Sequence, residues 1–457
     1  MMTRTFAWTD EEVRAALGLE GGSAGEYPGI STDTRALGPG ELFVALTGER
    51  FDGHAFLAAA AAAGARGAVV SQAVEPPEGM VLYRVEDTLV ALGDLARHRR
   101  IAMGARVVGI TGSSGKTSTK DFTRGALAGH FRVHATRGNR NNRVGLPLTL
   151  LEAPEDAEVI VAEMGTSEPG EIRELVRIGL PDVGVVVTVS ESHLDCLVDL
   201  DGVMTEKLDM IRGLAPEAVG LVGDTPESLP RSAREIRSDV RVAGLSTGSD
   251  PELRPCRLQV DSRGRYRFAW RGEVVSLRVA GRHMAYDAVI ALAIADILGV
   301  PADLAAEGVS SVRATGMRGE ERRVGAVRLL IDCYNANPQS TRAALDALAA
   351  RTGNGPRAVI LGTMLELGSR AAALHDEVLD YALSLGLDLV VATGAFATAL
   401  PGRSGATLIR AEDPGEGYRA VLPVLRQGGV LLLKASRGVA LERLIPALET
   451  ELLGGGD

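Results

Sequence analysis

The chain has 457 residues, a formal net charge of −10 and only 4% aromatic residues. This length fits two or three domains. The acidic balance and the shortage of aromatic side chains argue against a general nucleic-acid-binding protein. The apolar fraction of 46% and the charged fraction of 24% are those of an ordinary globular protein.

Neither the cysteines nor the N-terminus points to secretion. The three cysteines are far apart and show no CxxC spacing: Cys196, Cys256 and Cys333. A disulfide framework or a zinc site is therefore not expected. Residues 1–17 are acidic and lack a continuous apolar region, so no signal peptide is apparent. The longest apolar stretch, 55–70, is mostly alanine and reads as a core helix running into a strand. We expect a cytoplasmic protein without stable membrane insertion.

Residues 1–97 are predicted to form a small α/β domain. A helix from about 53 to 63 lies among three strand patterns: ELFVALTG (41–48), RGAVVSQ (66–72) and MVLYRV (80–85). Alternation of helices and strands is the pattern of α/β layers. A charged helix, 88–104, then leads into the next strand and marks a natural boundary.

Residues 98–311 are predicted to form a central domain built on a mostly parallel sheet. Its buried strands have unbroken Val and Ile content, which is typical of parallel strands covered on both faces: RVVGITG (106–112), EVIVAEMG (158–165) and VGVVVTVS (183–190). Residues 256–281 instead alternate with period two around two glycine-containing turns. They predict a three-stranded antiparallel meander attached to the parallel sheet, and a helix over 284–300 closes the domain.

Residues 312–457 are predicted to form a third α/β domain. Four strands are expected: within 327–338, 357–364, 388–394 and 428–436. Helices over 339–350 and 371–386 separate them. Such a pattern indicates a Rossmann-like open sheet, although no GxGxxG opens it.

The stretch GITGSSGKTSTK (109–120) has the features of a phosphate-binding loop. It follows a strand and precedes a helix, which is the context such a loop requires. Gly112 and Gly115 would let backbone amides turn inward, Lys116 adds a cation, and Thr117 offers a hydroxyl to Mg²⁺. The strict GxxxxGK[ST] pattern would need glycine where Ile110 stands, so this is a shortened TGxxGKTS variant. The alternative is a Gly/Ser turn that merely contains a lysine.

Three further residues are candidates for the same chemistry. Glu163 ends a buried strand, where a phosphate-loop protein holds its metal; the alternative is an acid facing solvent. His193 and Lys207, taken singly, would be read as a satisfied polar residue and a solvated cation. Lysine is scarce, however, with only Lys116, Lys120, Lys207 and Lys434 in the chain. Because lysine can become a neutral nucleophile and arginine cannot, a retained lysine indicates chemistry.

The motifs together resemble the Mur ligases, the ATP-dependent amide ligases of peptidoglycan precursor synthesis. They occur in the family's order: TGSSGKTS (111–118), TRGNRNNRVGLPLTLLEA (136–153), the Glu163 strand, His193–Leu194 followed by Lys207, GRHMAYDA (281–288), IDCYNANPQS (331–340) and GTMLELG (362–368). Residues 30–56 (ISTDTRALGPGELFVALTGERFDGHAF), YNANP and MLELG are similar to the member that adds D-alanyl-D-alanine to UDP-N-acetylmuramoyl-tripeptide. The resemblance spans essentially the whole chain.

The resemblance implies roles for individual residues. ATP would be held by the phosphate loop: Thr111, Gly112, Ser113, Ser114, Gly115, Lys116, Thr117 and Ser118. Adenine-side and ribose contacts would come from His283, Asp287 and Asp332. The uridine nucleotide would be bound by Thr32, Asp33, Thr34 and Arg35. The diphosphate and muramoyl part would face Thr136, Asn139, Asn141 and Asn142. The incoming dipeptide would be bordered by Asn335, Asn337 and Pro338.

The resemblance also implies two Mg²⁺ ions. Thr117 and Glu163 would serve the first, and His193 the second. Lys207 would react with CO₂ to form a carbamate whose oxygens support the second ion. Arg318 would reach the γ-phosphate. The catalytic set would then consist of Lys116, Glu163, His193, Lys207 and Arg318. The protein is expected to be a monomer.

Five positions depart from the family's usual pattern: Met284, Asp287, Cys333, Thr363 and Ala435. None is expected to touch the phosphate, metal or carbamate groups.

Four alternatives stay open at this point. A Mur ligase that adds a diamino acid would be expected to carry a DNPR string, which is absent. A folylpolyglutamate-synthase-like enzyme would lack the first domain. A phosphate-loop switch protein would leave Lys207 and the third domain without a role. A degenerate paralogue that binds a UDP-sugar without catalysis is disfavoured by the intact catalytic set.

Overall fold

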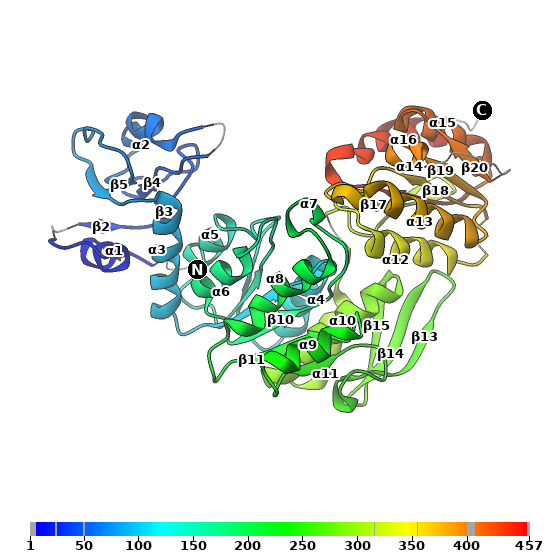
Figure 1. Cartoon of the computed structure of the whole chain (residues 1–457), viewed down its shortest axis with the longest axis horizontal. Helices are drawn as coiled ribbons and strands as arrows, with labels where there is room; N and C mark the ends of the chain where they lie inside the picture. Colours follow the sequence, from blue (N-terminus) through cyan, green and yellow to red (C-terminus); the bar gives the residue numbers. More distant parts are fainter. Residues whose placement is uncertain are drawn as a thin grey trace.

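The computed structural model describes residues 6–22, 25–48, 51–314, 316–353, 355–399 and 407–454. Residues 1–5 of the acidic N-terminal stretch and residues 49–50 of the 30–56 motif lie outside these ranges. Three α/β bodies follow one another along the chain, coloured blue, cyan to green, and yellow to red (Figure 1). The expected α/β class and three-domain architecture are confirmed.

The N-terminal body is a four-stranded parallel sheet in the order β3 (Ile30–Ser31), β4 (Leu42–Val44), β5 (Gly67–Val70) and β6 (Val81–Arg84). The helix expected over 53–63 is a 3₁₀ turn (Gly53–Phe56) that runs into α2 (Leu57–Ala62). A short antiparallel pair, β1 (Trp8–Thr9) with β2 (Glu26–Tyr27), flanks α1 (Asp10–Leu17) and was not predicted.

Helix α3 (Thr88–Ala102) joins this body to the central one. Asp87 caps its N-terminus by accepting from the amides of Leu89 and Val90. Its buried face packs against α1, and also against α5 (Gly145–Leu151) and α6 (Glu171–Gly179) of the central body. The predicted boundary at 97/98 falls within α3, and the one at 311/312 falls at the end of α11 (Ala302–Ser311). Both boundaries stay predictions.

The central body is built on six parallel strands. Their order is β12 (Arg241–Ala243), β11 (Val219–Gly223), β10 (Val183–Val186), β7 (Arg106–Thr111), β9 (Val159–Glu163) and β8 (Val133–Ala135). One face packs on α5, α6, α8 (Leu200–Arg212) and α9 (Ser228–Ile236). The other packs on α4 (Lys116–Ala128), α10 (Arg282–Ile297) and α11. Burial of both faces explains the unbroken Val and Ile content of these strands.

The predicted meander is present as β13 (Cys256–Val260), β14 (Arg265–Trp270) and β15 (Glu273–Ala280), with antiparallel pairing throughout. It forms a sheet of its own and is not hydrogen-bonded to the parallel sheet as an extra set of strands. Its attachment is through side chains, because Phe268, Trp270 and Val275 are buried in the same core as α10 and α11.

The C-terminal sheet has six strands where four were predicted. The order is β16 (Glu320–Val324), β17 (Val327–Asp332), β21 (Gly429–Lys434), β18 (Arg357–Leu361), β19 (Leu389–Ala392) and β20 (Leu408–Arg410). The two missed strands are the edges, and β16 runs antiparallel to β17. Helices α12 (Pro338–Ala349) and α13 (Ala371–Ser384) lie on one face, and α15 (Pro414–Leu425) and α16 (Ile445–Gly454) on the other.

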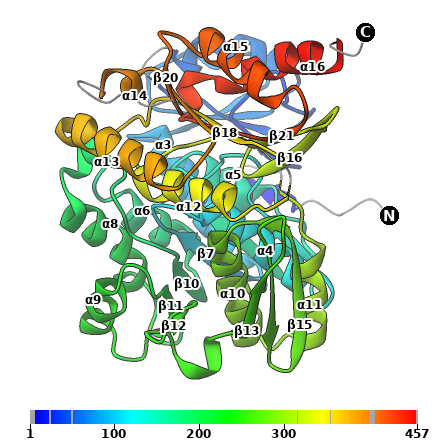
Figure 2. The ribbon, with the colours of Figure 1, turned by 90° about the vertical axis from the view of Figure 1, so that its right-hand side faces the viewer.

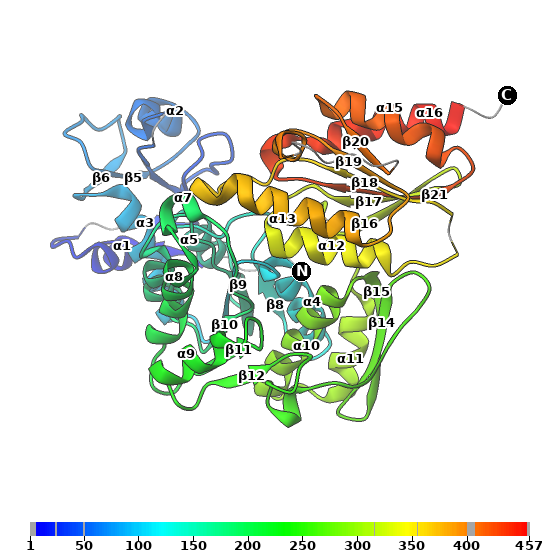
Figure 3. The ribbon, with the colours of Figure 1, turned by 45° about the vertical axis from the view of Figure 1, so that its right-hand side comes forward.

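The C-terminal body is placed above the central one, with α12 at the junction (Figures 2 and 3). Helix α12 contacts α10, and the short helix α7 (Leu194–Leu197) contacts the 3₁₀ turn Gly368–Arg370 that precedes α13. Within the described ranges, no helix combines the length and apolar character needed to cross a membrane. The three cysteines are free.

Candidate active site

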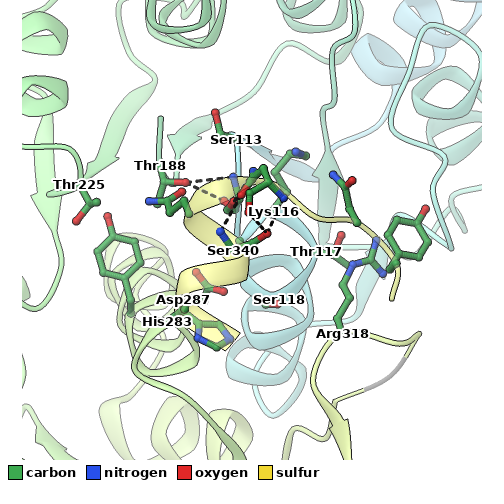
Figure 4. Close-up of a pocket in the computed structure, with 18 of the residues that line it drawn as sticks. Ser113, Lys116, Thr117, Ser118, Thr188, Thr225, His283, Asp287, Arg318 and Ser340 are labelled. Atoms are coloured by element: carbon green, nitrogen blue, oxygen red, sulfur yellow. Dashed lines mark hydrogen bonds between the residues drawn. The ribbon is translucent and has the colours of Figure 1, made fainter. Parts of the chain in front are cut away.

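A cavity of about 670 Å³ lies where the central and C-terminal bodies meet. The phosphate loop and the end of β9 line it from one side, α10 from below, and α12 with the segment after β17 from the other side. Figure 4 shows Lys116 and Thr117 of α4, His283 and Asp287 of α10, and Ser340 of α12 around this space. Of the predicted residues, the cavity wall contains Ser113, Ser114, Gly115, Lys116, Thr117, Ser118, Asn139, Asn141, Asn142, Glu163, His193, His283, Asp287, Arg318, Asp332, Asn335 and Asn337.

The phosphate loop is shaped by two glycines with positive φ, 151° at Gly112 and 82° at Gly115. A Cβ at Gly112 would come within 3.1 Å of the backbone of Thr188, so this close approach requires glycine. Thr188, just beyond β10, supports the loop by accepting from the amides of Ser113 (2.8 Å) and Ser114 (3.2 Å). Helix α4 begins at Lys116 without a side-chain cap, which leaves its N-terminal amides available to an anion.

The hydroxyl of Thr117 meets the carboxylate of Glu163 inside the cavity. Thr117 donates to Glu163 at 2.8 Å, and the Nδ2 of Asn141 donates to the other carboxylate oxygen at 2.8 Å. Thr136 supports the same strand end by accepting from the Glu163 amide at 3.0 Å. Burial of Glu163 with these partners fixes its carboxylate at the edge of the phosphate loop. In the described part of the chain, no cluster of three or more His, Cys, Asp or Glu is placed to hold a metal ion.

Burial lowers the pKa of two lysines near the phosphate loop. Lys116 donates to the carbonyl of Gly112 at 2.7 Å, and burial lowers its pKa. Lys207 on α8 is completely buried, and its Nζ has no hydrogen-bond partner. Burial, and then the charge of Lys116, lower the pKa of Lys207 well below its ordinary value. Lys207 is therefore a buried, unpartnered amine whose surroundings disfavour its charged form, and it does not line the cavity.

His193 faces the cavity from the start of α7 and is paired with a residue of the C-terminal body. Its Nδ1 lies 2.7 Å from Oε2 of Glu366, and this hydrogen bond lowers the pKa of the Glu366 carboxyl. The backbone joins at the same place, since the Leu194 amide donates to the Glu366 carbonyl at 2.9 Å. Glu366 belongs to the MLELG motif but was not predicted as a site residue.

Helix α10 brings two titratable side chains to the floor of the cavity. Burial lowers the pKa of His283 and raises that of Asp287 well above its ordinary value. Asp287 packs directly against the phosphate loop, because a Cβ at Gly115 would lie 2.5 Å from its Oδ1. The expectation that no departure from the family pattern touches the phosphate-binding set is therefore wrong for Asp287.

The C-terminal body contributes two cationic side chains, Arg318 and Lys434, to the cavity wall. Arg318 stacks on Tyr334, with its guanidinium carbon 3.6 Å from the ring centroid. It lines the same cavity as Thr117 (Figure 4). Lys434 pairs with Asp332 at 2.9 Å and donates to the carbonyl of Asn335 at 2.8 Å. These pairings hold the segment after β17 against the cavity.

Asn337 is both a helix cap and an interdomain contact. Its side chain accepts from the Ser340 amide at 2.7 Å and so caps α12. Its Nδ2 donates to the hydroxyl of Ser114 at 3.0 Å, which ties α12 to the phosphate loop.

Some predicted residues lie elsewhere. Five of them do not line the cavity: Thr111, Gly112, Thr136, Lys207 and Pro338. Thr32, Asp33, Thr34 and Arg35 lie in the N-terminal body, apart from this cavity. There Arg35, an exposed side chain, pairs with Asp33 at 2.7 Å and helps lower the pKa of that carboxyl to about 2.

The residues that sequence reasoning missed include Thr188, Glu366 and Lys434. A partial signal existed for each. Thr188 follows a buried strand of the predicted parallel sheet, Glu366 lies in the MLELG motif, and Lys434 is one of only four lysines.

Comparison with known families gives matches in all three bodies. Residues 26–100 match the "Mur ligase family, catalytic domain", residues 110–295 the "Mur ligase middle domain", and residues 317–437 the "Mur ligase, glutamate ligase domain".

Individual proteins match over nearly the whole chain. UDP-N-acetylmuramoyl-tripeptide–D-alanyl-D-alanine ligase of Bacillus subtilis is 34% identical over 98% of this chain and 99% of its own. A crystal structure of MurF from Acinetobacter baumannii superimposes with a TM-score of 0.90, at 28% identity, over 98% of this chain and 99% of that one. MurF ligase from Thermotoga maritima in complex with ADP gives a TM-score of 0.82 at 26% identity, over 93% and 97% of the two chains.

Proposed function

Because the chain belongs to the Mur ligase family, we propose that it is the ATP-dependent ligase that joins D-alanyl-D-alanine to UDP-N-acetylmuramoyl-tripeptide in peptidoglycan precursor synthesis. Full-length similarity to relatives of that name supports this choice of substrates. The observation that carries the activity is the cavity between two bodies, where a phosphate loop, Glu163 and Arg318 face one space. In such a place a nucleotide phosphate and a second substrate can meet.

ATP is proposed to bind with its phosphates on the loop and its nucleoside toward α10 and β17. The free amides at the start of α4 and the cation of Lys116 suit the phosphate oxygens. His283 and Asp287 would border the adenine side, and the carboxylate of Asp332, at the end of β17, would accept from a ribose hydroxyl. ADP in the Thermotoga maritima structure supports use of the adenine nucleotide.

The residues at the loop fit a first Mg²⁺ ion. Mg²⁺ in nucleotide sites takes one or two protein oxygens and completes its shell with phosphate and water. The hydroxyl of Thr117 and the carboxylate of Glu163 are already adjacent, which matches that donor set. A bound Mg²⁺ supplies charge neutralisation for the transferred phosphoryl group. In this chain Asn141 holds the Glu163 carboxylate in orientation.

A second Mg²⁺ ion would be served by His193 and by a carbamate on Lys207. The buried, unpartnered Nζ of Lys207 supports the carbamate, because its lowered pKa favours the neutral amine and only a neutral amine adds to CO₂. In that reaction a bond forms between Nζ and the carbon of CO₂, and one amine proton is released, which leaves a carbamate anion. The Nζ of the unmodified lysine is buried and makes no hydrogen bond. The carbamate would add oxygens there that can accept hydrogen bonds or bind a metal.

The reaction then follows from charge. The tripeptide carboxylate attacks the γ-phosphorus of ATP, ADP leaves, and an acyl phosphate forms. The amine of the dipeptide attacks the acyl carbon, phosphate leaves, and the nitrogen loses a proton to give the amide. Lys116 and Arg318 would stabilise the charge on the phosphoryl oxygens. Contact of the C-terminal body with the loop through Asn337 would exclude water that hydrolyses the acyl phosphate.

The remaining substrate groups are assigned by domain. The uridine nucleotide would be bound on the N-terminal body by Thr32, Asp33, Thr34 and Arg35. The diphosphate and muramoyl part would be faced by Thr136, Asn139, Asn141 and Asn142. Asn335, Asn337 and Pro338 would border the dipeptide. Consumption of ATP supports the expectation that the protein works in the cytoplasm.

Phosphate release in a coupled assay tests this function. With ATP, Mg²⁺ and UDP-N-acetylmuramoyl-tripeptide, release is expected only after D-alanyl-D-alanine is added. Release without the dipeptide would favour a nucleotide switch, and no release with either substrate would favour a non-catalytic paralogue. Replacement of the dipeptide by single amino acids separates this activity from that of other amino-acid ligases.

A further inference from the structure

The contact between His193 and Glu366 crosses the boundary between the central and C-terminal bodies. His193 caps α7 in the central body, and Glu366 follows β18 in the C-terminal one. The side chains meet at 2.7 Å between Nδ1 and Oε2, and the backbones meet through the Leu194 amide and the Glu366 carbonyl at 2.9 Å. Helix α7 and α13 approach each other here (Figure 3). This joint connects the two bodies at the cavity.

Both partners hold an unusual backbone conformation. The φ angles of His193 and Glu366 are 54° and 64°, in the left-handed region that favours glycine. Such a conformation is strained and persists only where the surroundings of the residue fix it. Packing is close as well, because a Cβ at Gly368 would lie 3.2 Å from the Leu194 carbonyl oxygen. A chance ion pair on the surface would not need a strained backbone at both residues. The positive φ of His193 and of Glu366 therefore indicates that this contact is built into the joint.

The hydrogen bond fixes which ring nitrogen of His193 carries the proton. A carboxylate only accepts, so Nδ1 is the nitrogen that donates to Glu366, which makes Nε2 the ring nitrogen that could bind a metal. Histidines that bind metals commonly donate their other ring N–H to a carboxylate, which sets the tautomer and the ring orientation. We propose that Glu366 is a positioning residue for His193, and that docking of the C-terminal body thereby completes the second metal site. This inference rests on the proposed role of His193 as a metal ligand.

A neighbouring ion pair provides a matched control. Arg370 of the C-terminal body lies 3.6 Å from Glu191 of the central body, across the same joint, whereas the ion-pair partner of His193 is Glu366. The variant Arg370→Ala removes a docking contact without changing the partner of the imidazole. Any effect shared by Glu366→Ala and Arg370→Ala would come from docking, and any effect restricted to Glu366→Ala would come from the ring of His193.

Binding of Mn²⁺, followed by electron paramagnetic resonance, tests the proposal without turnover. The full-length protein is titrated with Mn²⁺ in the presence of a non-hydrolysable ATP analogue and UDP-N-acetylmuramoyl-tripeptide. We expect Glu366→Ala to weaken the binding of one Mn²⁺ ion by about 10- to 100-fold. Glu366→Gln, which keeps an oxygen acceptor without the charge, should weaken it less, and Arg370→Ala should leave it unchanged.

The variant His193→Ala distinguishes the positioning role of Glu366 from the proposed role of His193 as a metal ligand. If His193→Ala weakens Mn²⁺ binding and Glu366→Ala does not, Glu366 has no positioning role and the proposal is overturned. If neither variant changes Mn²⁺ binding, His193 is not a ligand, and the proposed metal site itself is wrong. If Arg370→Ala weakens Mn²⁺ binding as much as Glu366→Ala, domain docking alone explains the effect, which also overturns the proposal.

Discussion

The side chain of Asn337 binds the hydroxyl of Ser114 at 3.0 Å while it caps α12, so the phosphate loop and the C-terminal body share one amide. The variant Asn337→Asp separates these roles. Asp caps helices as well as Asn does, so α12 should keep its cap, and the melting temperature should fall only by the cost of placing a charge at this buried position. The new negative charge beside the loop should raise the KM for ATP about tenfold, through repulsion of the phosphates.

Steady-state kinetics and a melting curve check this prediction. Asp413→Asn is the matched control, because Asp413 caps α15 in the same way, by accepting from the Glu416 amide, far from the cavity. It should change neither the melting temperature nor the KM for ATP. An Asn337→Asp variant with an unchanged KM for ATP would show that the contact with Ser114 has no bearing on the nucleotide.

Loss of the Glu163 charge should stop the chemical step. Glu163→Gln is isosteric and keeps an oxygen that can accept from Thr117, so the fold should be preserved. Without a carboxylate at the metal position, kcat should fall by about 100-fold or more, and the Mg²⁺ concentration needed for half-maximal rate should rise. Phosphate release at varied Mg²⁺ measures both. Glu168→Gln, an exposed acid nearby, should behave as wild type, and full activity of Glu163→Gln would remove Glu163 from the catalytic set.

Substitution of Lys207 tests the carbamate. Lys207→Arg should abolish activity, because a guanidinium stays protonated and cannot add CO₂. Lys207→Ala should also be inactive, but short-chain carboxylates added to the assay should partly restore phosphate release by occupying the vacated space. The same carboxylates should not stimulate the wild-type enzyme. A fully active arginine variant would contradict the carbamate assignment.

Local motifs were predictable because their chemistry is local. The strand, glycines, lysine and helix of residues 106–128 lie in one continuous segment, so their sequence alone identified the phosphate loop. Strand β16 was missed because an exposed edge strand can consist of charged residues, as EERRV does. The pairing of His193 with Glu366 could not be predicted either, since it depends on how two separately folded bodies dock. The roles of individual residues toward ATP, Mg²⁺ and the substrates stay predictions, because they too depend on how the bodies and the substrates come together.

Cys333 should be resistant to thiol reagents in the folded protein. It is fully buried, and burial raises the pKa of its thiol from 9.0 to about 12. Because the folded pKa is raised, the protonated thiol stabilises the fold below pH 9.0, and this contribution is lost as the pH rises toward about 12. Near neutral pH, iodoacetamide should therefore label only Cys196 and Cys256, both exposed. Mass spectrometry counts the labels. A third label on the native protein would contradict the prediction, and Cys333→Ala should remove the label gained on unfolding.

Asp287 should make the stability of the protein fall as the pH rises. Burial raises the pKa of its carboxyl well above 3.8, so between the unfolded and the folded pKa the folded protein holds a proton that the unfolded chain releases. The stabilising contribution is complete below the ordinary pKa and is lost as the pH rises toward the folded one. Asp287→Asn carries no such proton, so its melting temperature should exceed that of wild type by a margin that grows as the pH rises above 3.8. Asp303→Asn, at an exposed position on α11, should show no growing margin, and a constant difference for Asp287→Asn would mean that Asp287 is already ionised in the folded protein.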